Sequence, residues 1–211
     1  MSLKIGLTMR SCDAVEYVEP RHGLALDWIP FMKNVFSEAV WTGIPNLGKD
    51  AVRHIRGLGI NALILTGGED FGKNPARDEL EFELIKFCLD NSHPILGICR
   101  GMQVLNFYFG GRISSVAREK HVATNHKIFL KREICGVTKI EVNSFHANGI
   151  SRCDLASDLI PIAVDEDENI EAFYQAENKI LGLMWHPERT SKSNRIDYEL
   201  IHLFFGGGNY E

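Results

Sequence analysis

The chain has 211 residues, of which 45% are hydrophobic, and its 28 acidic and 23 basic side chains give a formal net charge of −5. This length and apolar content suit a single domain spanning residues 1–211, and the mild negative charge without a basic stripe argues against a nucleic-acid partner. Neither a membrane-spanning apolar run nor a signal segment is apparent, so we expect a cytoplasmic protein without a membrane partner.

Strand-like apolar runs alternate with helical patterns along the first half of the chain. The expected strands span residues 4–9, 61–66 and 94–98. The expected helices span residues 50–58 and 77–91, and a third runs from Arg100 to the glycine pair at 110–111. Because these strands are apolar throughout, we expect helices to cover both faces of the sheet that they form.

The second half has fewer regular patterns. We expect strands at residues 139–143, 159–164 and 181–185, and a final helix at residues 195–205 with Asn194 as its cap. Residues 10–46 and 112–137 are interpreted as loops. The predicted fold class is α/β, a three-layer sandwich with a mostly parallel central sheet.

A candidate nucleophile lies at the end of the strand at 94–98. Cys99 is flanked by Gly97 and Gly101 in a G-x-C-x-G pattern, between a buried strand and a helix start. This arrangement is typical of a nucleophile elbow, where a side chain on either flank would collide with neighbouring backbone. The positive end of the following helix favours the reactive thiolate. A small buried cysteine with no chemical role is the alternative.

A candidate general base follows another apolar strand. His186 comes after the run at 181–185, and Glu188 lies two residues further, where strand alternation would place it on the same side. A carboxylate that binds one imidazole nitrogen leaves the other free to exchange a proton with a thiol. Taken singly, a backbone-bonded histidine and a solvated glutamate are the alternatives. Together with Cys99 they predict a catalytic triad.

The remaining cysteines and histidines offer little evidence for a metal. The five cysteines are widely scattered and form no C-x-x-C pair, which argues against a disulfide framework and a zinc site. His121 and His126 are spaced five apart, but we expect them to be surface loop histidines. The expectation is therefore a protein with neither a metal nor another cofactor.

These segments resemble the class I glutamine amidotransferase-like superfamily, over roughly residues 4–206. The cysteine elbow, the W-H-P-E segment at 185–188 and the glycine loop at 63–68 occur in that family's order. The resemblance implies a flavodoxin-like fold and a thioester formed between the nucleophile and a γ-glutamyl group. It also implies an oxyanion hole made by the backbone N–H groups of Arg100 and Gly68.

Within the superfamily, the C-R-G-x-Q pattern at 99–103 is similar to γ-glutamyl hydrolases, including those acting on γ-glutamyl-aminobutyrate. The segments at 67–70, 77–78 and 143–146 also resemble that branch. The match implies that Gln103 holds the glutamyl end of the substrate and that His146 lies near it. Short members of the branch include hydrolases of γ-glutamyl-CDP-amidate, which serve capsule phosphoramidate synthesis.

The favoured hypothesis is a free-standing hydrolase that takes a small γ-glutamyl substrate and releases glutamate with an amine or amidate. Two alternatives stay open: a glutaminase subunit that supplies ammonia to a separate synthetase, and a binding module that has lost its chemistry. Arg10, Arg21 and Arg112 could meet an anionic leaving group, although solvated arginines are the simpler interpretation. The sequence indicates neither the leaving group nor the oligomeric state.

Overall fold

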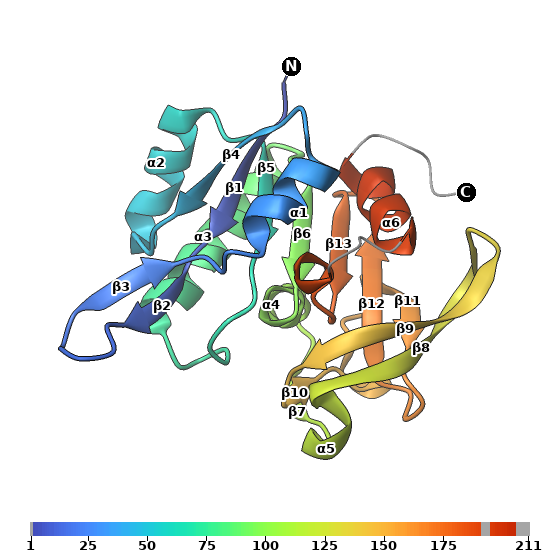
Figure 1. Cartoon of the computed structure of the whole chain (residues 1–211). Helices are drawn as coiled ribbons and strands as arrows, with labels where there is room; N and C mark the ends of the chain where they lie inside the picture. Colours follow the sequence, from blue (N-terminus) through green and yellow to red (C-terminus); the bar gives the residue numbers. More distant parts are fainter. Residues whose placement is uncertain (1, 191–194, 206–211) are drawn as a thin grey trace.

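The computed structural model describes residues 2–190 and 195–205, which are arranged around a nine-stranded sheet (Figure 1). Strands β4, β1, β5, β6 and β13 are parallel, and β12, β11, β8 and β9 continue the sheet in antiparallel fashion. In this spatial order their bounds are Val40–Ile44, Lys4–Thr8, Ala62–Leu65, Ile95–Ile98, Ile180–Leu183, Ile170–Gln175, Ile160–Val164, Val122–Ile134 and Val137–Phe145.

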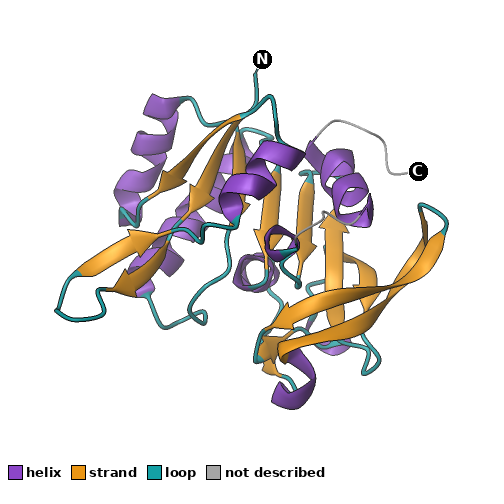
Figure 2. Cartoon of the chain, in the orientation of Figure 1, coloured by secondary structure: helices purple, strands orange, loops and turns teal. Residues whose placement is uncertain are grey.

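Helices cover both faces of this sheet, which confirms the predicted three-layer α/β fold (Figure 2). The helices α1 (Trp28–Val35) and α6 (Arg195–Phe205) contribute to one apolar core, and α2 (Ala51–Leu58), α3 (Pro75–Asp90) and α4 (Arg100–Tyr108) to the other. Within β5, Ile64 belongs to the first core while Leu63 and Leu65 belong to the second. Burial on both faces explains why the central parallel strands β5, β6 and β13 carry no polar side chain.

The elements expected in the first half are confirmed, with ends that follow local chemistry. Helix α2 stops at Gly59, whose φ of 68° is left-handed and suits a residue without a Cβ. Helix α3 begins after Asn74, whose side chain accepts a hydrogen bond from the backbone N–H of Arg77. Asn194, the predicted cap of α6, lies outside the described residues.

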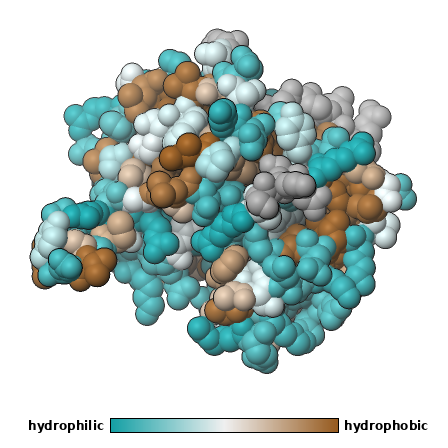
Figure 3. Space-filling view, in the orientation of Figure 1, coloured by the Kyte–Doolittle hydropathy of each residue, from teal (hydrophilic) through white to brown (hydrophobic). Residues whose placement is uncertain are grey.

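The interpretation of residues 10–46 and 112–137 as loops is wrong. Besides α1, β4 and most of β8, they contain β2 (Arg10–Asp13), β3 (Pro20–Gly23), β7 (Ser114–Ser115) and α5 (Arg118–His121). Strands β2 and β3 form a polar, largely exposed hairpin that projects from the molecule, so they lack an apolar pattern. The tip of this hairpin exposes apolar surface, with Val15 100% and Val18 96% accessible (Figure 3).

Smaller elements complete the chain. The strand β10 (Asn148–Gly149) pairs with β7, and the 3₁₀ turns η1, η2 and η3 span Gly48–Asp50, Arg152–Asp154 and Pro187–Arg189. Among the described residues, no helix has both the length and the apolar character that crossing a membrane requires.

Candidate active site

Cys99 lies at the sharp turn between β6 and α4, at the carboxyl edge of the parallel strands. Its φ of 51° and ψ of −106° are strained for a residue with a side chain. The flanking glycines are required by space, because a Cβ on Gly101 would lie 2.1 Å from the Leu65 carbonyl oxygen and one on Gly97 would lie 2.7 Å from the Gly101 backbone. Cys99 is only 7% exposed, so its thiol is largely shielded from solvent.

His186 is held next to Cys99 by contacts to its ring and to its backbone. Its Nδ1 lies 2.7 Å from Oε1 of Glu188, and both side chains are buried. Asn143 on β9 brackets the His186 backbone, since its Oδ1 accepts from the His186 N–H and its Nδ2 donates to the His186 carbonyl, both at 2.8 Å. These contacts fix the imidazole and its tautomer, leaving Nε2 for another partner.

Glu188 meets His186 through a turn and not through the strand alternation expected from the sequence. Strand β13 ends at Leu183, so His186 follows the strand after two further buried residues. Pro187 then begins the 3₁₀ turn η3, and this turn directs the Glu188 carboxylate back to the imidazole. The expected contact is present, but the reason given for it is wrong.

The charge state of His186 reflects opposing effects. Burial lowers the pKa of His186, but hydrogen bonds to Cys99 and Glu188 outweigh it and raise the pKa to about 9. The imidazole is therefore protonated at neutral pH. A positive charge beside the sulfur stabilises a thiolate, as in other cysteine nucleophiles paired with histidine.

The glycine loop after β5 lies against this pair. A Cβ on Gly67 would lie 2.8 Å from His186 Cε1 and 3.7 Å from Cys99 Cβ, so only glycine fits there. Arg77, which is fully buried, donates from Nη2 to the carbonyl oxygens of Thr66 and Gly67 at 2.8 and 3.1 Å. Because the C=O and N–H of one trans peptide point in opposite directions, the N–H of Gly68 points away from Arg77.

A buried ion network supports this loop and the first turn of α4. Glu81, which is inaccessible to solvent, accepts hydrogen bonds from Arg77, from Arg100 and from the Thr8 hydroxyl. Arg100 also pairs with Asp78. The network thus joins the side chain next to the nucleophile with the side chain that holds the glycine loop.

Gln103 faces a cavity rather than bulk solvent. Its side chain is 3% exposed, and its Nε2 donates to the Asn148 carbonyl at 2.8 Å. The cavity has a volume of about 450 Å³ and is lined by Phe71, Gln103, Phe107, Arg112, Ile113 and Asn148. The role of Gln103 in binding substrate stays a prediction, but its position beside a cavity next to α4 suits that role.

His146 follows β9 and shares the Asn148 carbonyl with Gln103. Its Nδ1 lies 2.9 Å from that oxygen, and its ring packs beside His121, with 4.8 Å between ring centroids. The expectation that His121 is a surface histidine is wrong, because its side chain is 1% exposed; that of His126 is 13% exposed. Both lie where α5 and β8 pack against the antiparallel strands, a packing that sequence spacing does not reveal.

The three arginines named from the sequence lie in different settings. Arg10 borders a small pocket shared with Gly67, His186 and Glu188. Arg112 borders the larger cavity, pairs with Asp154 at 2.8 Å and remains 73% exposed. Arg21, in contrast, pairs with Glu19 on the projecting hairpin.

Sequence reasoning missed two residues with a direct part in this geometry. Arg77 and Asn143 fall in segments whose resemblance was noted, but no spacing rule predicted that they would hold the glycine loop and the His186 backbone. An arginine in the first turn of an expected helix is one signal that could have been used, because the helix dipole disfavours a positive charge there and the residue needs another reason for its position.

Comparisons with known proteins identify the family to which the chain is similar. Residues 43–188 match the peptidase C26 family. The γ-glutamyl-CDP-amidate hydrolase of Campylobacter jejuni is 36% identical over 199 residues, covering 91% of this chain and 93% of that protein. A glutamine amidotransferase-like protein of Lactococcus lactis is 33% identical over 177 residues, covering 70% of this chain and 74% of that protein.

A solved structure extends the comparison to the whole fold. A GMP synthase-like protein from Thermoplasma acidophilum superposes with a TM-score of 0.72 at 19% identity, covering 98% of this chain and 94% of that one. This likeness concerns the fold. The family match and the 36% identity to the Campylobacter protein show that the chain belongs to the peptidase C26 family of class I glutamine amidotransferase-like proteins.

Proposed function

We propose that this protein is a cysteine hydrolase that cleaves a γ-glutamyl amide bond through a γ-glutamyl thioester. The observation that carries the proposal is the assembly of Cys99, on a strained turn, with an imidazole that is itself bound by a buried carboxylate. This is the arrangement that nucleophilic acyl transfer needs: a thiolate, a proton carrier and an orienting group.

In the first half of the reaction, the Cys99 thiolate attacks the γ-carbonyl carbon of the substrate, and the carbonyl oxygen becomes an oxyanion. His186, protonated at Nε2, gives its proton to the departing nitrogen, and the carbon–nitrogen bond breaks to leave a thioester. In the second half, neutral His186 removes a proton from water, which attacks the thioester and releases glutamate. The carbon–sulfur bond breaks in this step, which regenerates the Cys99 thiolate. His186 keeps the proton taken from water, so the thiolate–imidazolium pair is restored.

The backbone N–H groups of Arg100 and Gly68 are our candidates for stabilising the oxyanion. Arg100 opens helix α4, so its N–H has no carbonyl partner one turn earlier. The Arg77 contact to the Gly67 carbonyl supports the second candidate, because it turns the Gly68 N–H away from Arg77. Each such donor typically lowers the barrier by about 3 kcal/mol.

A γ-glutamyl nucleotide amidate is the substrate class we favour. The support is the 36% identity to the γ-glutamyl-CDP-amidate hydrolase, over nearly the full length of both chains. Gln103 and the neighbouring cavity would receive the small molecule, with Arg10 and Arg112 as candidate partners of its phosphates. A role in capsule phosphoramidate synthesis would follow from that substrate.

The test is glutamate release by the purified protein from γ-glutamyl-CDP-amidate, γ-glutamyl-aminobutyrate and glutamine, each at the same concentration. We expect turnover of a γ-glutamyl amide without a second protein. Cys99→Ala should abolish it and Cys153→Ala, at an exposed thiol, should not. Turnover of glutamine alone, and only after a synthetase is added, would instead support the glutaminase subunit.

A further inference from the structure

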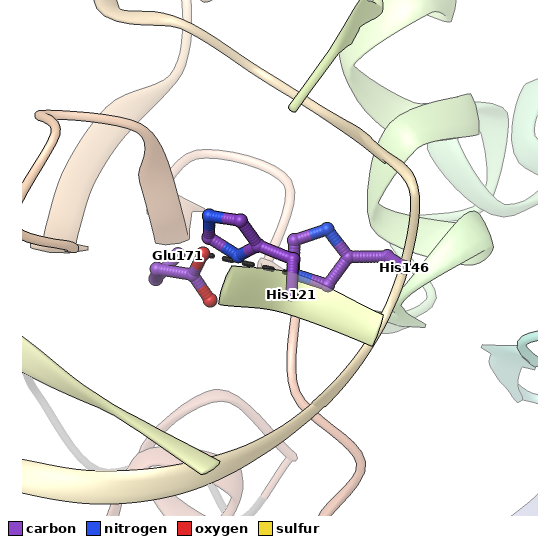
Figure 4. Close-up of side chains that lie close together, drawn as sticks. All are labelled: His121, His146 and Glu171. Atoms are coloured by element: carbon purple, nitrogen blue, oxygen red, sulfur yellow. Dashed lines mark ion pairs between the residues drawn. The ribbon is translucent and has the colours of Figure 1, made fainter. Parts of the chain in front are cut away.

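A compact cluster of histidines and carboxylates lies within the antiparallel half of the molecule. His121 of α5, His146 after β9 and Glu171 of β12 point toward one another, as Figure 4 shows. His126 of β8 and Asp165 after β11 adjoin them. We call these five residues the histidine cluster; the side chains of His121, His146 and Glu171 are each no more than 2% exposed.

Several buried polar atoms of the histidine cluster make no hydrogen bond with another described residue, although the cluster contains ion pairs of 3.3 Å between His121 and Asp165 and between His126 and Glu171. Both carboxylate oxygens of Glu171, both ring nitrogens of His121 and the Nε2 atoms of His126 and His146 have no hydrogen-bond partner within the described part of the chain. A buried polar atom without a partner typically costs about 1–3 kcal/mol, and a buried charge costs more. Several buried polar atoms without hydrogen bonds in one place indicate that they share a bound ligand.

The tautomer of His146 makes the mismatch sharper. Its Nδ1 lies 2.9 Å from the Asn148 carbonyl oxygen, so the hydrogen resides on Nδ1 and Nε2 carries a lone pair. That Nε2 faces Oε1 of Glu171 at 3.8 Å. Two electron-rich atoms that face each other in a buried site match the surroundings of a cation.

We propose that the histidine cluster binds one divalent transition-metal ion through His121, His146 and Glu171, with His126 as the fourth ligand. The types of ligand in this set favour zinc. One donor atom from each of the first three residues lies within 4.8 Å of the others. In a tetrahedral zinc site, donors about 2.0–2.1 Å from the metal lie about 3.3 Å from one another, so small side-chain rotations complete the geometry. Imidazole and carboxylate ligands together suit zinc.

The surroundings provide an outer partner and a route for the ion. Asp165 Oδ2 lies 3.3 Å from His121 Nε2, where it can orient that ring, as carboxylates beside metal-bound histidines do. A cavity of about 300 Å³ reaches His121 and His126 from outside. Its wall carries four carboxylates and two lysines, a net negative charge that attracts cations; the carboxylates are those of Glu141, Asp165, Glu166 and Asp167, and the lysines are Lys120 and Lys127.

The closed ligand set assigns the metal a structural role. Four protein ligands leave no position for a substrate, which is the pattern of structural rather than catalytic zinc. The ligands come from α5, β8, the end of β9 and β12, so the ion would tie the β8–β9 hairpin to β12, which lies two strands from β8 in the same sheet. That hairpin carries Asn143, which holds the His186 backbone. The proposal does not depend on the identity of the substrate.

The experiment measures zinc per chain by elemental analysis after purification, and again after removal by a chelator, reloading with equimolar zinc sulfate and dialysis. We expect close to one zinc per chain in the wild-type protein. His121→Gln and Glu171→Gln should weaken zinc binding by more than about 100-fold in competition with a chromophoric chelator, and Asp165→Asn by about 10–100-fold. His54→Gln, at an exposed histidine of α2, should bind as the wild type does.

Two controls keep the site assignment open to refutation. Cysteine and histidine of the triad could themselves bind zinc, so Cys99→Ala must retain the ion; its loss there would overturn the proposal. Asp167 belongs to a second possible set with His121 and Asp165, so Asp167→Asn must also retain it. If the variants at buried positions fail to fold, two other measurements decide whether the cluster binds metal. They are zinc binding by His126→Gln, at a partly exposed position, and the absorption spectrum of the cobalt-loaded wild type. A reloaded wild-type protein without bound metal would also overturn the proposal.

Discussion

Replacing Arg77 by methionine separates the support of the glycine loop from the chemistry of the thiol. The change removes the hydrogen bonds to the Thr66 and Gly67 carbonyls, so the Gly67–Gly68 peptide is free to rotate. Loss of one oxyanion donor typically lowers kcat by about 100–1,000-fold. Because the donor here is misdirected rather than deleted, we expect a fall of roughly 10–100-fold in kcat with a smaller change in KM.

The same substitution should also destabilise the protein, and the two effects can be measured apart. Arg77→Met leaves the buried Glu81 with one fewer cation, and breaking a buried pair in this way costs about 3–5 kcal/mol. At about 2–4 °C per kcal/mol for a chain of this size, Tm should fall by roughly 6–20 °C. Activity is therefore assayed well below the Tm of the variant, with folding checked by circular dichroism.

Glu69→Gln is the matched control for Arg77→Met. Glu69 accepts from Nη1 of Arg77 at 2.9 Å, so this change removes an ion pair of the same arginine but spares both carbonyl contacts. Its kcat should stay within about 2-fold of the wild-type value. A folded Arg77→Met protein with wild-type kcat would refute the idea that Arg77 sets the direction of the Gly68 N–H.

The remaining predictions concern the proposed triad. Iodoacetamide should label Cys99 faster than the exposed Cys135 and Cys153, as peptide mass spectrometry would report; equal rates would contradict an activated thiol. Glu188→Gln should keep a kcat roughly 10–100-fold higher than that of His186→Ala, because the proposed role of Glu188 is to orient the imidazole and not to carry the proton. The folded pKa of His186, about 9, exceeds the ordinary value of 6.5, so its stabilisation is complete below pH 6.5 and is lost as the pH rises through 9. Between pH 6.5 and 9, the Tm of the wild type should therefore fall more steeply with pH than the Tm of His186→Gln. Parallel plots of Tm against pH would count against a protonated His186.

The sequence predicts those parts of the fold in which burial produces a recognisable run of apolar residues. β5 and β6 are apolar at every position, so their runs stand out, and the glycine at the end of α2 marks its boundary. The edge strand β4 and the hairpin strand β2 are mostly exposed or half-buried, so their pairing rather than their composition makes them strands. Proline at the third position of α1 likewise makes that helix hard to predict from residue propensities, because proline disfavours the interior of a helix.

The candidate site divides in the same way. Cys99 and His186 are accessible to sequence reasoning because each follows an apolar strand and lies in a short recognisable pattern. The histidine cluster is not, because Glu171 lies in a strand without any pattern of its own and meets His121 and His146 only through the antiparallel pairing. Distant contacts of this kind follow from topology, which spacing along the chain does not encode.

The position of β13 in the sheet bears on how the protein is made. This strand pairs with β6, yet it lies far later in the chain, and it carries the segment that ends in His186. During synthesis, Cys99 therefore leaves the ribosome well before its imidazole partner, and the apolar β6 remains an open sheet edge that invites aggregation. Docking of β13 closes that edge and, in the same event, brings the imidazole to the sulfur, so the reactive pair cannot form in a nascent chain whose sheet is still incomplete.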